Sequence, residues 1–327
     1  MQHWDGVRKN CWNLFDDGAK RLSCNGDVIN IAALGEHSVS SSNAVDDAAN
    51  GLFVSPSQRW LAAGGADGTA RVWELASGKL LAKSEIAKDS VAVLGFGATD
   101  DELFTLIYSG HLSRQSRAMQ INVWDLRLHH LRRSWSVPAP AAACRFLLKG
   151  RFIVGFRDEQ PLRVWSTDDF RLLWEMPVTG EEMEVAVSPD QQLLAIVTQS
   201  KHVGLRDVLS GTLLGELRGG HIGLQSVAFL PDGQRIDGSS HGSEAVKLWH
   251  VESRQELLTL GGKGSMLKEL RVSPDGNWIG ARGSRGDLNV WHAPSWDEIE
   301  AVERSQKDQT FGTAQEPMNP PGKGVPQ

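Results

Sequence analysis

The sequence predicts an all-β fold built from repeated units of about forty residues, and three observations support this prediction. Short β-type runs follow one another and end in residues that favour turns, as in FVS, RWLAAGG and TARVWEL between residues 53 and 75. A tryptophan near the end of the third run recurs along the chain, and a turn sequence recurs with it. Three strands of this size cannot bury their apolar faces alone, so the repetition supplies the neighbours that they need.

The recurring tryptophan marks the third strand of each expected unit. It stands at intervals of 51, 41, 84 and 42 residues, at Trp73, Trp124, Trp165, Trp249 and Trp291. The longest interval covers two units, with Arg206 in the tryptophan position near its midpoint. At 41 residues before Trp73, the equivalent position of the preceding unit holds Ala32. We therefore expect seven units.

A turn between the first and second strands repeats in parallel with the tryptophan. Its members are Asp17-Gly18, Ser57-Gln58, Lys149-Gly150, Asp190-Gln191, Asp232-Gly233 and Asp275-Gly276. Glycine and short polar residues suit such turns because they tolerate the backbone angles that a reversal requires. Four strand-like runs per unit of about forty residues are typical of a β-propeller.

Several segments resemble the WD40 repeat. They are GLFVSPS…ADGTARVWE, SVAFLPDG…AVKLW and VSPDG…GDLNVW, together with the Gly220-His221 pair. The resemblance covers roughly residues 7–303 and includes bacterial propellers that occur alone or C-terminal to serine/threonine protein kinases. It implies a seven-bladed WD40-type β-propeller with radial four-stranded blades, which generally serves as a platform for partners.

The expected domain is a propeller over residues 1–303, with units at about 7–46, 47–88, 89–138, 139–178, 179–219, 220–263 and 264–303. The first unit should end in a poor, serine-rich outer strand within HSVSSSN. Residues 294–303 favour a short C-terminal helix, with an outer strand as the alternative, and residues 304–327 favour a disordered tail rich in proline and glycine. Residues 1–6 look too short and polar to complete the last unit, so we expect no strand exchange between the termini.

Composition excludes several classes of function. A formal charge of −6 gives no general attraction for nucleic acid, and the sequence holds no run of about eighteen apolar residues that would cross a membrane. Three cysteines without a CxxC motif favour neither a metal site nor redox chemistry. We expect a cytoplasmic monomer without a cofactor.

One connection is about ten residues longer than its counterparts. It lies in the third unit between ELFTLIY and QINVWD and carries His111, Arg114 and Arg117 with no acidic residue. A basic loop on an acidic protein is a candidate contact for a partner. The alternative is a neutral surface insertion, which loops tolerate at little cost.

Catalytic motifs are present only in unsuitable contexts. Residues 238–242 match G-x-S-x-G, but a nucleophile elbow requires a strand-to-helix turn, and this segment lies between strands. Residues 265–268 match S-x-x-K without the motifs that accompany it. The WD40 resemblance implies a buried tetrad of His, Ser or Thr, Asp and Trp. The sixth unit has His221 but no Asp in its next turn, and the second unit has Asp67 and Trp73 but no preceding His. We expect no catalytic, cofactor-binding or metal-binding residues.

These observations predict a non-catalytic scaffold for protein–protein interaction that binds an unidentified protein or peptide at one rim. Two alternatives remain open. One is a regulatory or sensing module of a bacterial kinase-type signalling protein. The other is a propeller enzyme with a small-molecule site in its central channel.

Overall fold

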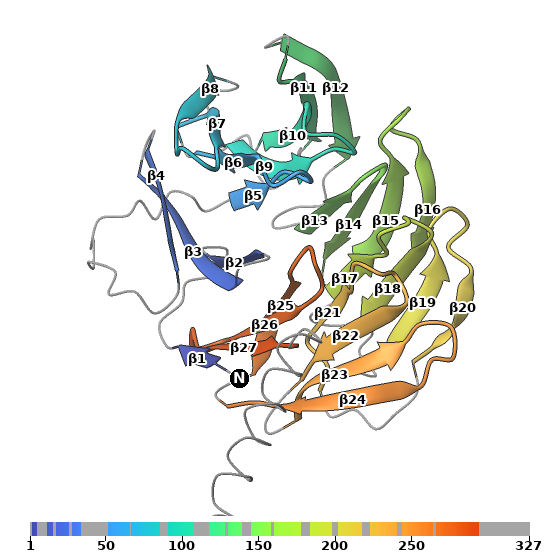
Figure 1. Ribbon diagram of the computed structural model, residues 1–327. Coiled ribbons are helices and arrows are strands. Elements are labelled where there is room, and N and C mark those ends of the chain that lie inside the picture. Colours follow the sequence, from blue (N-terminus) through green and yellow to red (C-terminus); the bar gives the residue numbers. More distant parts are fainter. Residues whose placement is uncertain are drawn as a thin grey trace, which may run out of the picture. The chain divides into compact units, whose positions relative to one another are not determined.

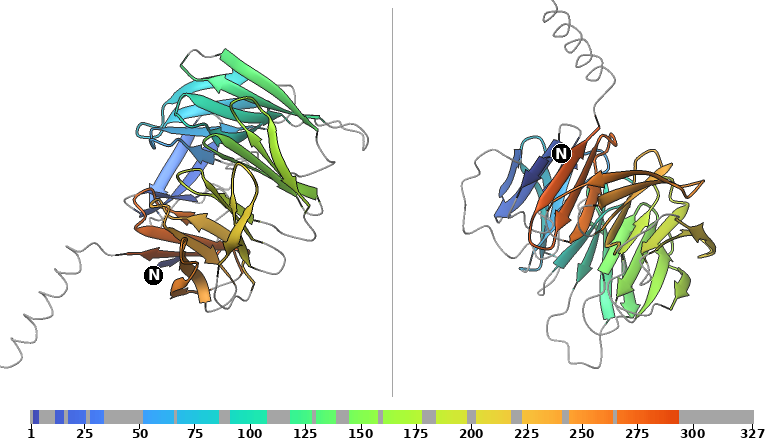
Figure 2. Two further views of the ribbon diagram at one scale, coloured as in Figure 1. Left: turned by 90° about the vertical axis from the view of Figure 1, so that its right-hand side faces the viewer. Right: turned by 90° about the horizontal axis from the view of Figure 1, so that it is seen from below.

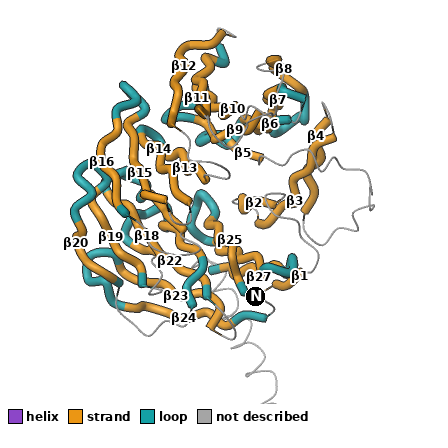
Figure 3. The backbone as a smooth tube through the Cα atoms, turned by 180° about the vertical axis from the view of Figure 1, so that it is seen from behind, coloured by secondary structure: helices purple, strands orange, loops and turns teal. Residues whose placement is uncertain are grey.

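A computed structural model of the chain describes the backbone of residues 2–4, 12–15, 18–25, 28–33, 52–65, 67–85, 91–107, 118–127, 130–138, 145–157, 160–177, 184–197, 202–217, 223–240, 244–263 and 266–293. These residues form strands and loops alone, which confirms the all-β class for the described part of the chain (Figures 1 and 3). Most of the chain belongs to one compact unit, Met1–Trp291, and a second unit begins at His292.

The described strands form seven antiparallel sheets, numbered here in chain order. The first sheet has three strands, β2 (Trp12–Phe15), β3 (Gly18–Asn25) and β4 (Val28–Ala33). The second contains β5 (Leu52–Val54), β6 (Trp60–Gly64), β7 (Thr69–Glu74) and β8 (Leu80–Glu85). The third contains β9 (Val91–Phe96), β10 (Glu102–Ile107), β11 (Ala118–Asp125) and β12 (His130–Pro138).

The next three sheets repeat the same up-and-down order. The fourth contains β13 (Arg145–Lys149), β14 (Phe152–Arg157), β15 (Gln160–Ser166) and β16 (Leu172–Met176). The fifth contains β17 (Glu184–Val187), β18 (Leu193–Val197), β19 (Val203–Asp207) and β20 (Leu213–Glu216). The sixth contains β21 (Ser226–Phe229), β22 (Arg235–Ser239), β23 (Glu244–His250) and β24 (Glu256–Gly261).

The seventh sheet corrects the prediction that the termini exchange no strand. It contains β25 (Leu267–Val272), β26 (Trp278–Gly283) and β27 (Leu288–His292), and its fourth strand is β1 (Gln2–Trp4). The register pairs Gln2 with Val290 and Trp4 with Leu288, and Figure 2 shows the blue β1 beside the red β27. The prediction judged residues 1–6 by their side chains. Strand pairing instead depends on backbone N–H and C=O groups, which every residue but proline supplies in full.

Neighbouring sheets share their apolar side chains. In the second sheet Leu61 and Trp73 face one side, whereas Ala62 and Val72 face the other side and pack with Val93 of the third sheet. Similar clusters join the third sheet to the fourth, the fourth to the fifth, the fifth to the sixth and the sixth to the seventh. Because the inner strands are buried on both faces, they are nearly continuous apolar runs with little polar alternation.

The first strands bring the sheets together. β5 contacts β9, β9 contacts β13, and the series continues through β17, β21 and β25 to β2. The fourth strands contribute less to the core: Leu172 on β16, Leu213 on β20 and Leu257 on β24 are all exposed. β16, β20 and β24 are therefore less buried than the inner strands of their sheets.

Tight turns connect the first strand to the second and the third to the fourth; we call these strand ends the turn side and the opposite ends the loop side. Positive φ angles recur there, at Gly150, Gly233 and Gly276 between the first and second strands. Gln58 and Gln191 occupy the same turn position with φ of 58° and 62°. A side chain strains this left-handed backbone, and three of these five turns place glycine there.

Several predicted features lie outside the described residues. They include the outer strand of the first unit, the C-terminal helix over 294–303 and the tail 304–327.

A first prediction concerns the sixth sheet. Trp249→Ala should lower the free energy of unfolding by about 3–5 kcal/mol, because Trp249 is fully buried and the truncation leaves a cavity. Leu257→Ala is the control, since this leucine on the outer strand is 55% exposed and its loss should change stability by about 0.5 kcal/mol or less. Urea unfolding measures both, and a loss below about 1 kcal/mol for Trp249→Ala would contradict its role in the core.

A second prediction concerns the seventh sheet. Removing residues 1–4 should lower the free energy of unfolding by about 1–3 kcal/mol, because a few ladder hydrogen bonds are lost. The bared edge of β27 should also promote self-association, since an unpaired strand edge is a template for another chain. Thermal unfolding and light scattering test this. An unchanged melting temperature with no association would mean that β1 contributes nothing.

Candidate interaction surface

On the loop side, β11 and β12 of the third sheet extend beyond the end of β10. Ile107, the last residue of β10, pairs with Gln120, whereas β11 and β12 continue until Ala118 pairs with Pro138. At nine residues β12 is the longest strand in the described part of the chain. His111, Arg114 and Arg117 belong to the connection between β10 and β11, at 108–117, and lie outside the described residues.

The five marker tryptophans all lie on the third strand of their sheets, β7, β11, β15, β23 and β27. Trp73, Trp165 and Trp249 are buried, whereas Trp124 and Trp291 are half-buried. The two half-buried rings donate hydrogen bonds through Nε1, from Trp124 to Thr105 Oγ1 (3.0 Å) and from Trp291 to the Gly261 carbonyl (2.9 Å). These rings thus combine packing with a fixed polar contact.

The bond from Trp124 to Thr105 is the Trp–hydroxyl half of the tetrad that the WD40 resemblance implies. Thr105 lies two residues after Leu103, the cross-strand partner of Trp124. In the second, fourth and sixth sheets the same register places Ala63, Gly155 and Gly238 there, none of which has a hydroxyl. In those sheets this half of the tetrad is therefore absent.

Asp67 has a different set of partners. Its carboxylate accepts hydrogen bonds from Arg71 (2.6 Å) and Thr69 (2.6 Å) within the same turn. The bond from Arg71 holds the pKa of Asp67 well below its usual range, although burial opposes this. In the fifth sheet, Arg206 replaces the marker tryptophan and donates to the Gly211 carbonyl (2.7 Å), so it closes its own turn. Both residues stabilise local structure.

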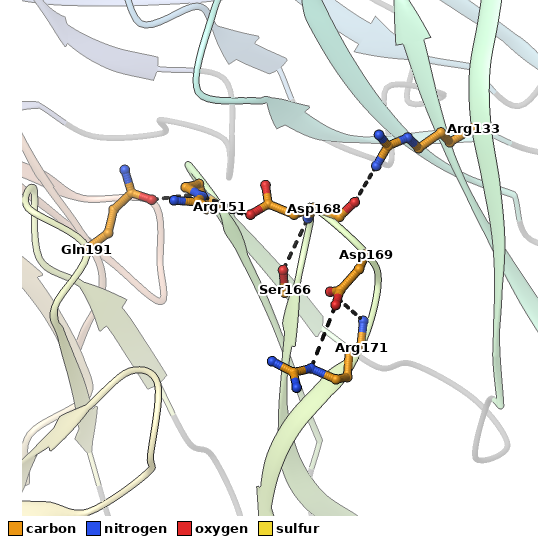
Figure 4. A network of polar contacts seen from close by, with 7 residues as sticks. All are labelled: Arg133, Arg151, Ser166, Asp168, Asp169, Arg171 and Gln191. Atoms are coloured by element: carbon orange, nitrogen blue, oxygen red, sulfur yellow. Dashed lines mark hydrogen bonds and ion pairs between the residues drawn. The ribbon is translucent and has the colours of Figure 1, made fainter.

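A polar network joins three sheets on the turn side (Figure 4). Arg133 of the third sheet donates to the Asp168 carbonyl of the fourth, and the Arg151 guanidinium donates to the Asp168 carboxylate. The Arg151 backbone N–H donates to Oε1 of Gln191 in the fifth sheet (2.8 Å). Because Arg151 and Asp168 are 65% and 52% exposed, solvent screens their ion pair, and its main effect is to position the turns.

Aromatic side chains pack beside this network. Trp135 on β12 stacks on Phe170 with ring centroids 4.9 Å apart, and it meets Trp165 edge-on at 5.5 Å. Phe170 has a φ of 56°, which is strained for a bulky residue, and the stacking on Trp135 favours this conformation. The stacking therefore helps to fix the turn that contains Asp168 and Phe170 against β12 of the third sheet.

The sequence pattern did not reveal this network. Asp168 binds Arg151, and the Asp169 carboxylate lies 3.7 Å from Arg171 Nε in the same turn. The partners of Asp168 are 17 and 35 residues away along the chain, at Arg151 and Arg133, so spacing gives no signal for them.

A small cavity lies between described residues of the second and third sheets. This cavity is about 20 Å³ and is lined mainly by apolar groups, including Val72, Leu103 and Trp124. Ligand pockets usually exceed about 300 Å³. Among the described side chains no three His, Cys, Asp or Glu residues are grouped as metal ligands require, and no described helix is long and apolar enough to span a membrane.

Comparison with known proteins supports a WD40-type repeat and a β-propeller fold. Residues 31–74 match the family described as "WD domain, G-beta repeat". This segment covers the end of β4 and the second sheet through Trp73. The chain thus contains a segment similar to the WD40 repeat, within a fold of repeated antiparallel sheets.

Two individual proteins are similar to this chain. Periodic tryptophan protein 2 of Arabidopsis thaliana is 24% identical over 264 residues, which cover 72% of this chain and 28% of that protein. The chain thus matches little more than a quarter of that relative. A chain in the crystal structure of a mitotic checkpoint complex superposes with a TM-score of 0.66 at 14% identity, over 90% of this chain and 95% of the other. This second likeness concerns the fold alone.

The strained turns give a third prediction. Gln58→Gly should raise the free energy of unfolding by about 0.5–1 kcal/mol, because glycine adopts a φ of 58° without strain and the Gln58 side chain has no hydrogen bond among the described residues. Gln191→Gly is the matched comparison: it relieves the same strain but loses the bond from the Arg151 amide. It should therefore stabilise less than Gln58→Gly or destabilise. Denaturant unfolding decides, and equal effects would show that the Gln191 contact is energetically neutral.

Proposed function

We propose that this chain is a non-catalytic platform for protein interaction and that its seven sheets are the blades of a seven-bladed WD40-type propeller. The observation that carries the proposal is the continuous series of shared apolar cores and first-strand contacts that links sheets of the same strand order. Such a scaffold holds loops and turns in fixed positions, where they form recognition surfaces. The proposed protein acts as a cytoplasmic monomer and binds a protein or peptide, without a cofactor and without contact to nucleic acid or membrane.

The proposed contact is the connection that contains His111, Arg114 and Arg117. The extended β11–β12 pair supports this assignment, because it anchors the connection on the loop side beyond the end of β10. The chain as a whole carries a formal charge of −6, so a basic, acid-free segment contrasts with its surroundings. Such a local contrast favours a partner with an acidic surface and accelerates its encounter with the loop.

The two alternatives receive less support. The relatives reported above give no reason to prefer a module attached to a kinase. A propeller enzyme would need acids or histidines converging on one cavity, whereas exposed acids such as Asp168 and Asp232 lie in turns with arginine partners.

A fourth prediction follows for the loop. Replacing Arg114 and Arg117 together by Glu should reduce capture of protein partners from the native cell extract at least tenfold and flatten the salt dependence of binding. The melting temperature should stay within about 2 °C, because surface changes of this kind have small effects on stability. Quantitative affinity capture with mass spectrometry provides the measurement.

The matched control reverses charge on the turn side. Arg127 and Arg171 are 77% and 73% exposed, and replacing both by Glu makes the same change in net charge at the opposite strand ends. Capture should survive this change. Equal losses in both double variants would assign the effect to net charge, and unchanged capture in both would leave the loop without a role in recognition.

A further inference from the structure

The packed interface between the sixth and seventh sheets, here called the seam, contains a buried carboxyl group without a polar partner among the described residues. Asp237 lies in the middle of β22 and is fully buried, at 0% exposure. Neither carboxyl oxygen has a hydrogen-bond partner within the described residues. Buried polar groups nearly always have partners, because an unpaired one loses its hydration without compensation.

The register shows which side Asp237 faces. It pairs with Ala228 on β21 and with Leu248 on β23, both of which belong to the apolar cluster shared with the seventh sheet. Its neighbour Ile236 pairs with Trp249 in the cluster shared with the fifth sheet. Because side chains alternate along a strand, the Asp237 side chain faces the seam with β25 and β26.

No described charged group faces Asp237 across this seam. On its own strand, Arg235 is on the same face at the exposed end and binds Asp232 at 2.7 Å. On β23, Lys247 alternates with Leu248, faces the other way and pairs with Glu256 at 3.2 Å. On β25 and β26, the seam is lined by Leu267, Leu270, Ile279 and Ala281. Glu269 and Arg271 alternate with Leu270 along β25 and therefore face away from the seam, where they bind each other at 2.8 Å. Lys268 is exposed, and Arg282 pairs in register with Glu269 on that other face.

We propose that Asp237 makes the seam between the sixth and seventh sheets sensitive to pH: the sheets pack tightly while the carboxyl group holds its proton and loosen when it ionises. An ionised carboxylate here would have neither contact with solvent nor a cation among the described residues that face it, so protonation is the route by which it becomes compatible with the seam. A hydrogen bond that joins the two sheets lies close to Asp237 and would be disturbed by its ionisation. Ser239, two residues further on β22, donates from Oγ to the Leu267 carbonyl of β25 at 2.9 Å.

The direction of the pH effect follows from the burial. Burial raises the pKa of Asp237 well above its usual range. The backbone N–H groups of Asp237 and Ala228 are near enough to oppose this in part, although neither reaches hydrogen-bonding geometry with the carboxyl group. The folded protein therefore binds a proton more tightly than the unfolded chain, whose Asp pKa is about 3.9. The contribution of Asp237 to the free energy of unfolding is complete at pH values below this unfolded pKa. It is lost as the pH rises towards the pKa of the folded state.

The test compares unfolding equilibria between pH 4.5 and 8.5. In the wild type the unfolding constant should rise with pH by as much as about tenfold per unit and then level off. In Asp237→Asn, which cannot ionise, this rise should disappear. Asp237→Ala is a second variant, since alanine fits the neighbouring position 228, and it should show the same flat profile. Asp275→Asn is the control, because Asp275 lies in an exposed turn where Ser273 and Asn277 outweigh burial and lower its pKa, so it should follow the wild type over this range.

Hydrogen exchange locates the effect and does not depend on a variant that folds. After correction for intrinsic rates, amides of β22 and β25 in the wild type should exchange faster relative to those of β14 and β18 at pH 8 than at pH 6. Parallel unfolding profiles for the wild type and Asp237→Asn would overturn the proposal, as would a uniform change in exchange across all sheets.

Discussion

The structure depends on the burial of each sheet on both faces. A four-stranded sheet with two apolar faces is insoluble alone, and only a neighbour on each side removes those faces from water. The cores shared between successive sheets meet this need. The same constraint explains why alanine, valine and glycine are frequent on the inner strands: the first strands of neighbouring sheets lie close together and leave little room. Larger side chains such as Trp73 and Trp249 enter from the third strands, further from these contacts.

The elements that the sequence predicted best are those defined by local chemistry. Tryptophan on the third strand of five of the seven units and Asp-Gly or its equivalent at the first turn are periodic signals, and the structure places them on the third strands and in the turns. The pairing of β1 with β27 was missed because a strand of only three residues, Gln2–Trp4, carries no recognisable apolar pattern, while its backbone groups pair as well as any others. The network around Asp168 was missed for another reason: Arg133, Arg151 and Gln191 come from three different sheets, and their turns meet only in the folded chain.

Asp237 could have been recognised from sequence by a stricter use of alternation. In RIDGS, Ile236 faces one shared core, and the next residue in a doubly buried strand must then face the other. An aspartate in that position conflicts with the pattern of the unit. Conflicts of this kind between a residue and an otherwise consistent pattern tend to mark functional or strained positions. Aspartates that lie in the turns carry no such conflict, since water and backbone amides are available to them.

The pairing of β1 with β27 also has a kinetic consequence. The contacts between residues 2–4 and 288–290 join positions that are almost the whole compact unit apart. Contacts of such long sequence separation slow folding, because the loop between the partners must be ordered before they can form. During synthesis the first residues leave the ribosome well before their partner strand exists, so the seventh sheet cannot be completed until β27 has emerged. Until then the first and seventh sheets lack partners, and this interval is when the chain is most exposed to wrong pairing with a second copy of itself.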